Sequence, residues 1–176
     1  MKNRFVVRGD ITIIFLDRQD GTVIETIIDT ADLPKAAAFP NKWCARWTES
    51  TKSFRPYGQL RGRQYYLYRW ILGLDDPNLD VDHINHDTLD NRRANLRIVT
   101  RSENHQNRRG APAYARTSQY RGVSLHKPTS KWKKTKWRAY ITLNGKQYSL
   151  GYYDTEEEAA QVAREARRRL MPFSRN

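Results

Sequence analysis

The sequence predicts an α+β fold made of small parts: a β-rich N-terminal region, a strand–loop–strand–helix segment, and a three-stranded sheet packed on one helix. Three observations lead to this expectation. Short segments of alternating apolar and polar residues, typical of strands, recur in the first half of the chain. A capping box predicts a helix after Thr100. Near the C-terminus, strand-like segments joined by Asn144-Gly145 precede a segment with helical periodicity.

The chain has 176 residues and a formal net charge of +13, which favours a polyanionic partner, either nucleic acid or an acidic membrane surface. Between Arg101 and Arg138 there are eleven Lys or Arg and one acidic residue, interleaved with aromatic residues. No amphipathic helix pairs this basic segment with an apolar face, so nucleic acid is the expected partner. A basic surface that is merely solvated is the alternative.

Composition also bears on the compartment. No run of residues approaches the length and apolarity of a membrane helix, and the N-terminal residues lack the pattern of a secretory signal. The single cysteine, Cys44, excludes an internal disulfide and a thiolate zinc site. We therefore expect a protein of the reducing cytoplasm.

Residues 1–54 are expected to form a β-rich region with little functional signal. A turn and a short helix are predicted after Asp29, and a β-hairpin that turns near Gly62 follows. The expected strands cover residues 3–8, 11–16, 22–28 and 43–47, the hairpin covers residues 57–68, and a brief apolar segment covers residues 68–74.

The next segment has the order strand, loop, strand, helix. Strands are expected at residues 79–84 and 96–99, on either side of a polar loop. The helix is predicted from the capping box of Thr100 and Glu103, with Gly110 as a plausible stop signal.

Residues 81–107 contain three of the four histidines and five asparagines, which indicates a chemical role. Neutral imidazole can take a proton from water at cellular pH, and carboxylate and amide oxygens suit Mg²⁺. Asp82 and His83 would point to opposite faces of a strand, but both can address one cleft if the strand ends there. This set of groups is suited to the hydrolysis of phosphodiesters.

Residues 81–109 resemble the His-Asn-His (HNH) family, and within it the asparagine-ended variant of phage and intron-encoded homing endonucleases. The motif consists of Asp82-His83, Asn95 twelve residues after the histidine, and Asn104 nine residues further on. The resemblance implies a ββα-metal nuclease centre, in which a hairpin and a helix surround one divalent metal ion, with Mg²⁺ expected and Mn²⁺ possible.

The resemblance also implies the roles of the motif residues. Asp82 and Asn104 would ligate the metal, His83 would be the general base, and Asn95 would brace the loop and orient the histidine. Many members carry histidine at the third position, and here His105 is adjacent to Asn104; the spacing favours Asn104. Taken singly, Asp82 as a surface charge and Asn95 as a turn residue are the plain alternatives. The basic residues expected to hold phosphate oxygens are Arg92, Arg93, Arg97 and Arg101.

Residues 119–170 resemble the plant ethylene-response-factor DNA-binding domain, through the matching pieces "YRGV", "KWRAYI" and "LGYYDTEEEAA". In that family a three-stranded sheet lies in the major groove and one helix packs behind it. Several positions differ from the plant members, so the target sequence cannot be transferred. Tyr148 and Tyr152 are expected to pack against the helix. The residues expected to face DNA are Arg121, Arg138, Tyr140, Thr142 and Gln147.

These observations predict a metal-dependent DNA endonuclease, a homing enzyme of phage or intron type, that nicks one strand of double-stranded DNA. It would work in the cytoplasm of a bacterial or phage-infected cell, as a monomer or weak dimer. A DNA-binding regulator with an inactive nuclease centre is the main alternative, and an RNA-binding protein is a third. The expected division is residues 1–54 (N-terminal region), 55–109 (nuclease domain), 110–118 (linker) and 119–172 (DNA-binding domain).

Overall fold

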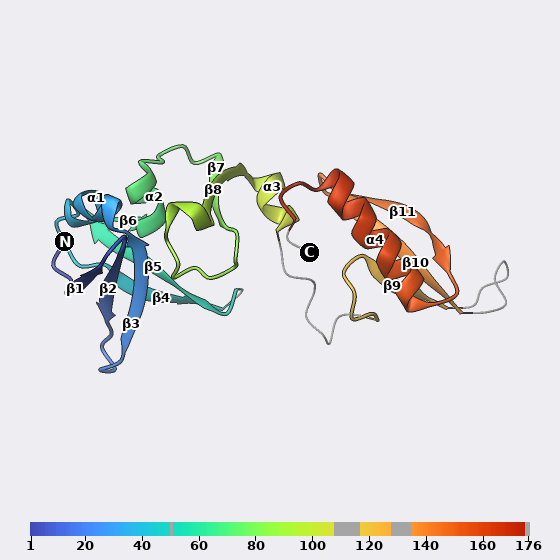
Figure 1. The fold of residues 1–176 in the computed structure, drawn as a ribbon, viewed down its shortest axis with the longest axis horizontal. Coiled ribbons are helices and arrows are strands. Elements are labelled where there is room, and N and C mark those ends of the chain that lie inside the picture. Colours follow the sequence, from blue (N-terminus) through green and yellow to red (C-terminus); the bar gives the residue numbers. More distant parts are fainter. Residues whose placement is uncertain (50, 108–116, 128–134, 175–176) are drawn as a thin grey trace. The chain divides into compact units, whose positions relative to one another are not determined.

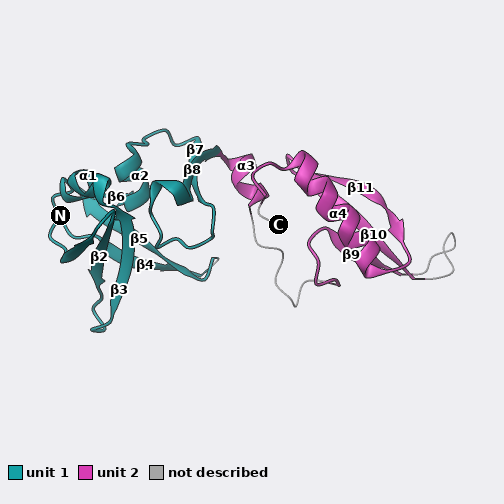
Figure 2. Cartoon of the chain, in the orientation of Figure 1, with its two compact units in different colours: residues 1–99 teal, residues 100–176 magenta. Residues whose placement is uncertain are grey.

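The structure, a computed structural model, describes residues 1–49, 51–107, 117–127 and 135–174 (Figure 1). The chain divides into two compact units, residues 1–99 and residues 100–176 (Figure 2). The first unit combines small sheets with short helices, and the second combines one three-stranded sheet with a short helix and a helix of 15 residues, so the fold is α+β. Among the described residues, no helix combines the length and apolarity that crossing a membrane requires.

The first sheet has the strand order β1-β2-β3 and is antiparallel throughout. In β2, Ile14 and Leu16 are fully buried and alternate with less buried residues, as expected of a strand with one face on a core. The predicted strands are confirmed with shifts of one or two residues, and the predicted turn and short helix follow. The elements are β1 (Phe5–Arg8), β2 (Ile11–Asp17), β3 (Val23–Asp29), η1 (Thr30–Asp32) and α1 (Leu33–Ala37).

The second sheet has the order β4-β5-β6, with bounds Cys44–Thr48, Ser53–Leu60 and Arg63–Tyr66. The hairpin predicted to turn near Gly62 is confirmed, since Arg61 and Gly62 both have positive φ between β5 and β6. The brief apolar segment that follows, for which the sequence analysis predicted no helix, forms helix α2 (Leu67–Leu72). A helix buries Leu67, Tyr68 and Ile71 on one side, and Gly73 ends it in the left-handed conformation.

One hydrophobic core serves the whole first unit. It includes Ile14 and Ile28 of the first sheet, Leu67 of α2 and Leu96 of β8 (Leu96–Thr100). At its centre Phe39 stacks on Trp43, with 4.0 Å between ring centroids. The boundary predicted between residues 54 and 55 falls inside β5, and the segments on its two sides share this core.

The strand–loop–strand–helix segment has the predicted order: β7 (Leu79–His83), a loop ending in η2 (Arg93–Asn95), β8, and α3 (Arg101–Gln106). The capping box is complete, because the Thr100 hydroxyl accepts from the Glu103 amide and Glu103 accepts from the Thr100 amide. Helix α3 ends at Gln106; the stop signal proposed at Gly110 lies outside the described residues.

The second unit contains a sheet of order β11-β10-β9, made of β9 (Val123–His126), β10 (Lys136–Leu143) and β11 (Lys146–Tyr153). Asn144 and Gly145 both have positive φ and form the predicted hairpin turn. Helix α4 (Glu156–Leu170) packs its alanine side on one face of the sheet, where Ala139 is fully buried. Most of the predicted linker, residues 110–118, lies outside the described residues.

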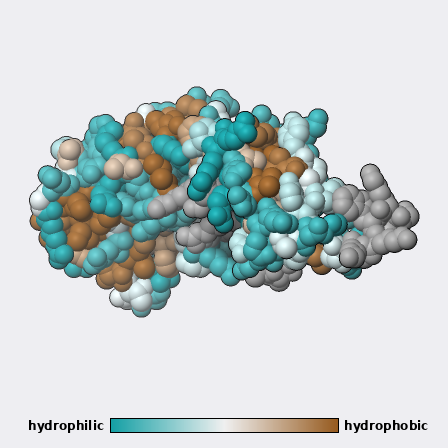
Figure 3. All heavy atoms as spheres, turned by 45° about the vertical axis from the view of Figure 1, so that its right-hand side comes forward, coloured by the Kyte–Doolittle hydropathy of each residue, from teal (hydrophilic) through white to brown (hydrophobic). Residues whose placement is uncertain are grey.

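The surface visible in Figure 3 is largely hydrophilic, with separate patches of hydrophobic residues. Some exposed apolar side chains belong to β1, an edge strand of the first sheet, where Phe5, Val6 and Val7 are each more than two-fifths exposed.

Candidate active site

Asp82 and His83 are the last two residues of β7, and both are buried, with 6% and 7% of their surfaces exposed. The strand ends at the histidine, as the sequence-based argument required for both side chains to address one site. Ionisable groups at this depth need hydrogen-bonding partners, because burial alone disfavours their charged forms.

Arg97, on the neighbouring strand β8, pairs with Asp82. Its Nε donates to Oδ2 of Asp82 at 2.8 Å, and its Nη2 lies 2.6 Å from the same oxygen. The guanidinium therefore balances the buried carboxylate. Arg97 was predicted to hold phosphate; here it has a structural partner, and the phosphate contact stays a prediction.

His83 is held by contacts on two sides of its ring. Its Nε2 is 3.0 Å from Oδ1 of Asn91, and its ring meets that of Tyr68 edge-on, with centroids 5.1 Å apart. Burial lowers the pKa of His83, and the hydrogen bond with Asn91 opposes that shift only in part. The imidazole is therefore neutral near pH 7, the form in which it can accept a proton. Burial also raises the pKa of Tyr68 to about 12, so its hydroxyl stays protonated.

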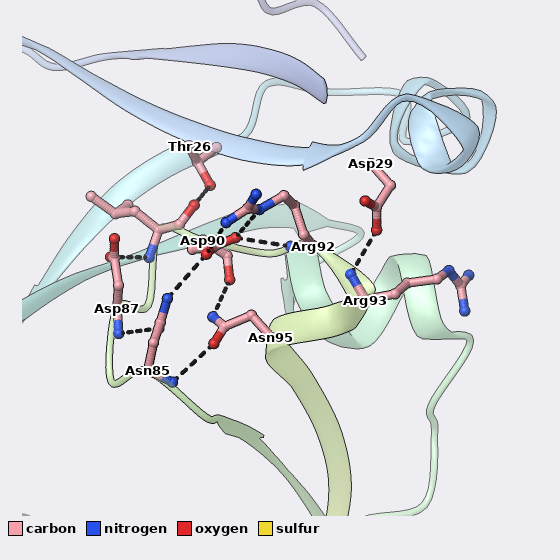
Figure 4. Close-up of polar contacts among 9 residues, drawn as sticks. Thr26, Asp29, Asn85, Asp87, Asp90, Arg92, Arg93 and Asn95 are labelled. Carbon is pink, nitrogen blue, oxygen red and sulfur yellow. Dashed lines mark hydrogen bonds and ion pairs between the residues drawn. The ribbon is translucent and has the colours of Figure 1, made fainter. Parts of the chain in front are cut away.

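Asn95 joins the two ends of the loop between β7 and β8 (Figure 4). Its Oδ1 accepts from the Asn85 amide at 2.9 Å, and its Nδ2 donates to the Asp90 carbonyl at 2.7 Å. The Asn95 carbonyl also accepts from the Ile84 amide. This geometry suits the bracing predicted for Asn95. The hydrogen-bond partner of His83 is not Asn95 but Asn91, which the sequence analysis did not single out.

Asp90 is a second residue that the sequence analysis missed, and it organises the loop interior. It is 4% exposed, and its carboxylate accepts from Nε and Nη2 of Arg92, each at 2.8 Å (Figure 4). Asn85 Nδ2 donates to the same carboxylate at 3.0 Å. The hydrogen bonds from Arg92 hold the pKa of Asp90 below its ordinary value. A concentration of Asn and Asp in a short loop is the only sequence signal for this network.

Arg93 connects the loop to the N-terminal region. Its Nε and Nη2 donate to the two carboxylate oxygens of Asp32, at 2.8 and 2.7 Å, and its backbone amide donates to Asp29 at 2.6 Å. Arg92 and Arg93 therefore anchor the loop, although their side chains remain 38% and 50% exposed. Arg101 is exposed at the start of α3. Phosphate binding by these arginines stays a prediction.

The donors proposed for a metal ion are chemically suitable. A carboxylate from Asp82 and an amide oxygen from Asn104 are hard oxygen ligands of the kind that Mg²⁺ and Mn²⁺ prefer. Asn104 lies on α3, in the second unit, and is partly buried. Within the described parts of the chain, no group of three or more His, Cys, Asp or Glu is placed to hold a metal ion. Water and phosphate oxygens commonly complete the coordination of Mg²⁺ in proteins.

The outer face of the C-terminal sheet is the face of β9, β10 and β11 opposite α4. On β10, Arg138, Tyr140 and Thr142 alternate with the buried Ala139 and Ile141 and so point outward. The Arg138 guanidinium lies 5.5 Å from the Tyr140 ring centroid. Gln147 is opposite Thr142 in the register and shares this face.

Arg121 is placed differently from the other predicted DNA contacts. It precedes β9, and its Nη1 donates to the Gln106 carbonyl at 2.9 Å and to the Ser174 hydroxyl at 3.2 Å. Within the second unit it therefore links α3 to the C-terminal residues. The DNA contact expected of Arg121 stays a prediction.

The expected packing of Tyr152 against the helix is wrong. Tyr152 pairs with Arg138 in the register, which places it on the outer face, and its ring lies 5.0 Å from that of His126. The neighbouring Tyr153 takes the inner position, where it packs against the core beneath α4. Tyr148 is paired with Ile141 on the helix side but remains 45% exposed.

Residues 72–106 match the family model described as HNH endonuclease. The match supports an HNH endonuclease domain. Its span contains Asp82, His83, Asn95 and Asn104, and it indicates nuclease activity on nucleic acid, with DNA as the implied substrate. No curated protein and no solved structure matches the chain.

Proposed function

We propose that this protein is a metal-dependent DNA endonuclease in which His83 is the general base and Asp82 and Asn104 bind one divalent metal ion, Mg²⁺ or Mn²⁺. The observation that carries the proposal is a neutral, buried histidine next to a carboxylate, at the end of a strand within the HNH-matching segment. The ring is held from its Nε2 side by Asn91, whose Oδ1 lies 3.0 Å away.

In the proposed reaction His83 takes a proton from water as the water oxygen attacks phosphorus. The bond between phosphorus and the 3′ oxygen breaks, and the departing oxygen takes a proton from solvent water, which leaves a 5′ phosphate and a 3′ hydroxyl. When bound, the metal ion would polarise the scissile phosphate and stabilise charge on the departing oxygen. One centre of this kind cuts one strand, so nicking is the expected product.

We assign DNA binding to the outer face of the C-terminal sheet, with Arg138, Tyr140, Thr142 and Gln147 as contacts. A sheet face that carries the half-buried Arg138 and Tyr140 together with the exposed Thr142 and Gln147 suits a duplex groove. The ethylene-response-factor-like domain, the homing role and the phage or intron origin belong to the same proposal, with a monomer or weak dimer acting on double-stranded DNA.

The direct test is incubation of the full chain with supercoiled plasmid, in Mg²⁺ or in EDTA. We expect open circles with Mg²⁺ only. A plasmid that stays supercoiled while DNA binding is demonstrated in the same preparation would instead support a DNA-binding regulator. One observation favours that alternative: Arg97 already occupies an oxygen of the Asp82 carboxylate proposed to bind the metal.

The metal assignment has its own test on α3. Asn104→Ala should abolish Mg²⁺-supported nicking, because it removes the proposed amide ligand, whereas His105→Ala should be mild. Titration of each variant with Mg²⁺ and with Mn²⁺ measures this difference. An inactive His105→Ala together with an active Asn104→Ala would place the metal ligand on the other residue.

A further inference from the structure

We propose that Thr26, on strand β3 of the N-terminal sheet, and Asn91, in the loop after β7, are positioning residues for His83. Together they form a hydrogen-bond chain that fixes the orientation and tautomer of the imidazole. This inference rests on the proposed nuclease function, and it gives the N-terminal sheet a part in the active site.

The loop docks on β3 through its backbone. The Ile27 amide donates to the Leu89 carbonyl at 2.9 Å, and the Asn91 amide donates to the Ile27 carbonyl at 2.8 Å. Ile27 and Asp90 form a parallel bridge. Because β3 is at the edge of its sheet, it has free backbone groups with which the loop can pair as a short additional strand.

The side chains continue this docking, and each hydrogen bond has a defined direction. The Thr26 hydroxyl donates its single proton to the Leu89 carbonyl at 2.7 Å. Its oxygen therefore accepts from Asn91 Nδ2, which is 2.9 Å away. The same Nδ2 donates to the Thr88 carbonyl at 3.3 Å. Both the Thr26 hydroxyl oxygen and the Thr88 carbonyl accept from the same end of the Asn91 side chain, so that end must be the NH₂ group. The other end, Oδ1, therefore faces His83.

An amide oxygen can only accept a hydrogen bond, so Nε2 of His83, 3.0 Å from Asn91 Oδ1, must carry the hydrogen. The lone pair of the neutral ring is then on Nδ1, which is the atom that can take a proton from water. Thr26 and Asn91 are both fully buried, so solvent cannot readily replace either partner. Thr26, which is 57 positions before His83 in the sequence, thus helps to determine which imidazole nitrogen acts as the base.

The test uses Thr26→Val, which keeps the shape of the side chain and removes the hydroxyl, and Thr26→Ser, which restores it. Loss of the hydrogen-bond partner of a metal-ligating histidine costs about 10–100-fold in activity or metal affinity, and we expect a loss of similar size for the partner of a histidine that acts as a base. We expect kcat for nicking to fall about tenfold or more in Thr26→Val, with KM for DNA unchanged, and to recover largely in Thr26→Ser. Asn91→Ala should lower kcat at least as much.

Thr12→Val is the matched control. Thr12 is also fully buried in the same sheet, where its hydroxyl is 3.1 Å from that of Thr30 rather than bonded to the loop. If the role of Thr26 is positional, Thr12→Val should retain kcat even where it lowers stability. Equal losses of kcat in Thr12→Val and Thr26→Val would overturn the proposal.

A second readout requires no nuclease activity. Nitrogen-15 NMR of the imidazole in the intact chain without metal distinguishes the two neutral tautomers. We expect the Nε2–H form of His83 in the wild type and in Thr12→Val, and a mixture or the other tautomer in Thr26→Val. If the His83 ring of the wild type carried its hydrogen on Nδ1, the proposed hydrogen-bond chain would be refuted even if the variants failed to fold. If the tautomers behave as expected and the plasmid is never nicked, the nuclease assignment fails and the positioning stands.

Discussion

The surroundings of His83 and the outer face of the C-terminal sheet both contain polar side chains, but these are largely buried around His83 and more exposed on the outer face. Around His83, Asn91, Asn95 and Asp90 are almost completely buried, and their polar groups are directed at specific partners. On the outer face, Thr142 and Gln147 are exposed, on strands whose other side packs on α4. The first arrangement fixes one atom relative to its neighbours, as a reaction at a single bond requires. The second leaves Thr142 and Gln147 exposed to solvent, as the DNA contact proposed for this face requires.

The arginines follow the same division. Arg92, Arg93 and Arg97 pair with Asp90, Asp32 and Asp82, so their charges stabilise the site. Arg138 instead lies over Tyr140, and its buried Nε has no hydrogen-bond partner among the described residues. A basic side chain therefore cannot be assigned to DNA binding from its type alone; the acids beside it decide what it is free to contact.

The largest expected effect is on the nicking rate, when one histidine in each region is replaced by alanine. His83→Ala should lower the nicking rate by roughly two to four orders of magnitude, the usual worth of general acid–base catalysis, with DNA affinity nearly unchanged. His126→Ala, on the outer face, should leave kcat intact and weaken binding slightly. Single-turnover rates and binding isotherms on the same duplex measure the effects on cleavage and on DNA affinity separately. Comparable cleavage by His83→Ala would remove that residue from the role of base.

Stability should also distinguish the regions. Asn95→Ala leaves the buried Asp90 carbonyl and the part-buried Asn85 amide without their side-chain partner, so it should lower the free energy of unfolding by about 1–3 kcal/mol. Thr142→Ala, at an exposed position, should change it by less than about 0.5 kcal/mol. Urea denaturation of both variants measures the contrast. Equal effects would mean that the loop network contributes no more to stability than an exposed threonine.

The smallest expected effect is on the salt dependence of DNA binding. Arg138→Ala should weaken binding and reduce the log–log slope of affinity against salt by about 0.9, the value for one lost phosphate contact. Gln147→Ala removes an uncharged side chain from the same face, so the slope should stay as in the wild type. Binding titrations over a range of salt concentrations provide the measurement. An unchanged slope for Arg138→Ala would place the main phosphate contacts elsewhere.

The sequence by itself determined the features that depend on neighbouring residues. The capping box at Thr100, the turn at Asn144-Gly145 and the inward–outward alternation of β10 are all present as predicted. Each is set by interactions within a turn of helix or between adjacent residues of a strand, so a local pattern is sufficient. The spacing of Asp82-His83, Asn95 and Asn104 likewise indicated the HNH segment that the family match supports.

Tertiary structure alone decided which residues surround the histidine. Asn91 was one of several asparagines in a polar loop, and Thr26 lay in a region with little functional signal, until docking of the loop on β3 brought them together. Tertiary structure also decided that residues on both sides of the predicted boundary at position 54 pack into one hydrophobic core. Pairing of distant segments depends on which sheet edges are open and which apolar faces must be buried together, and neither is encoded within a short stretch of sequence.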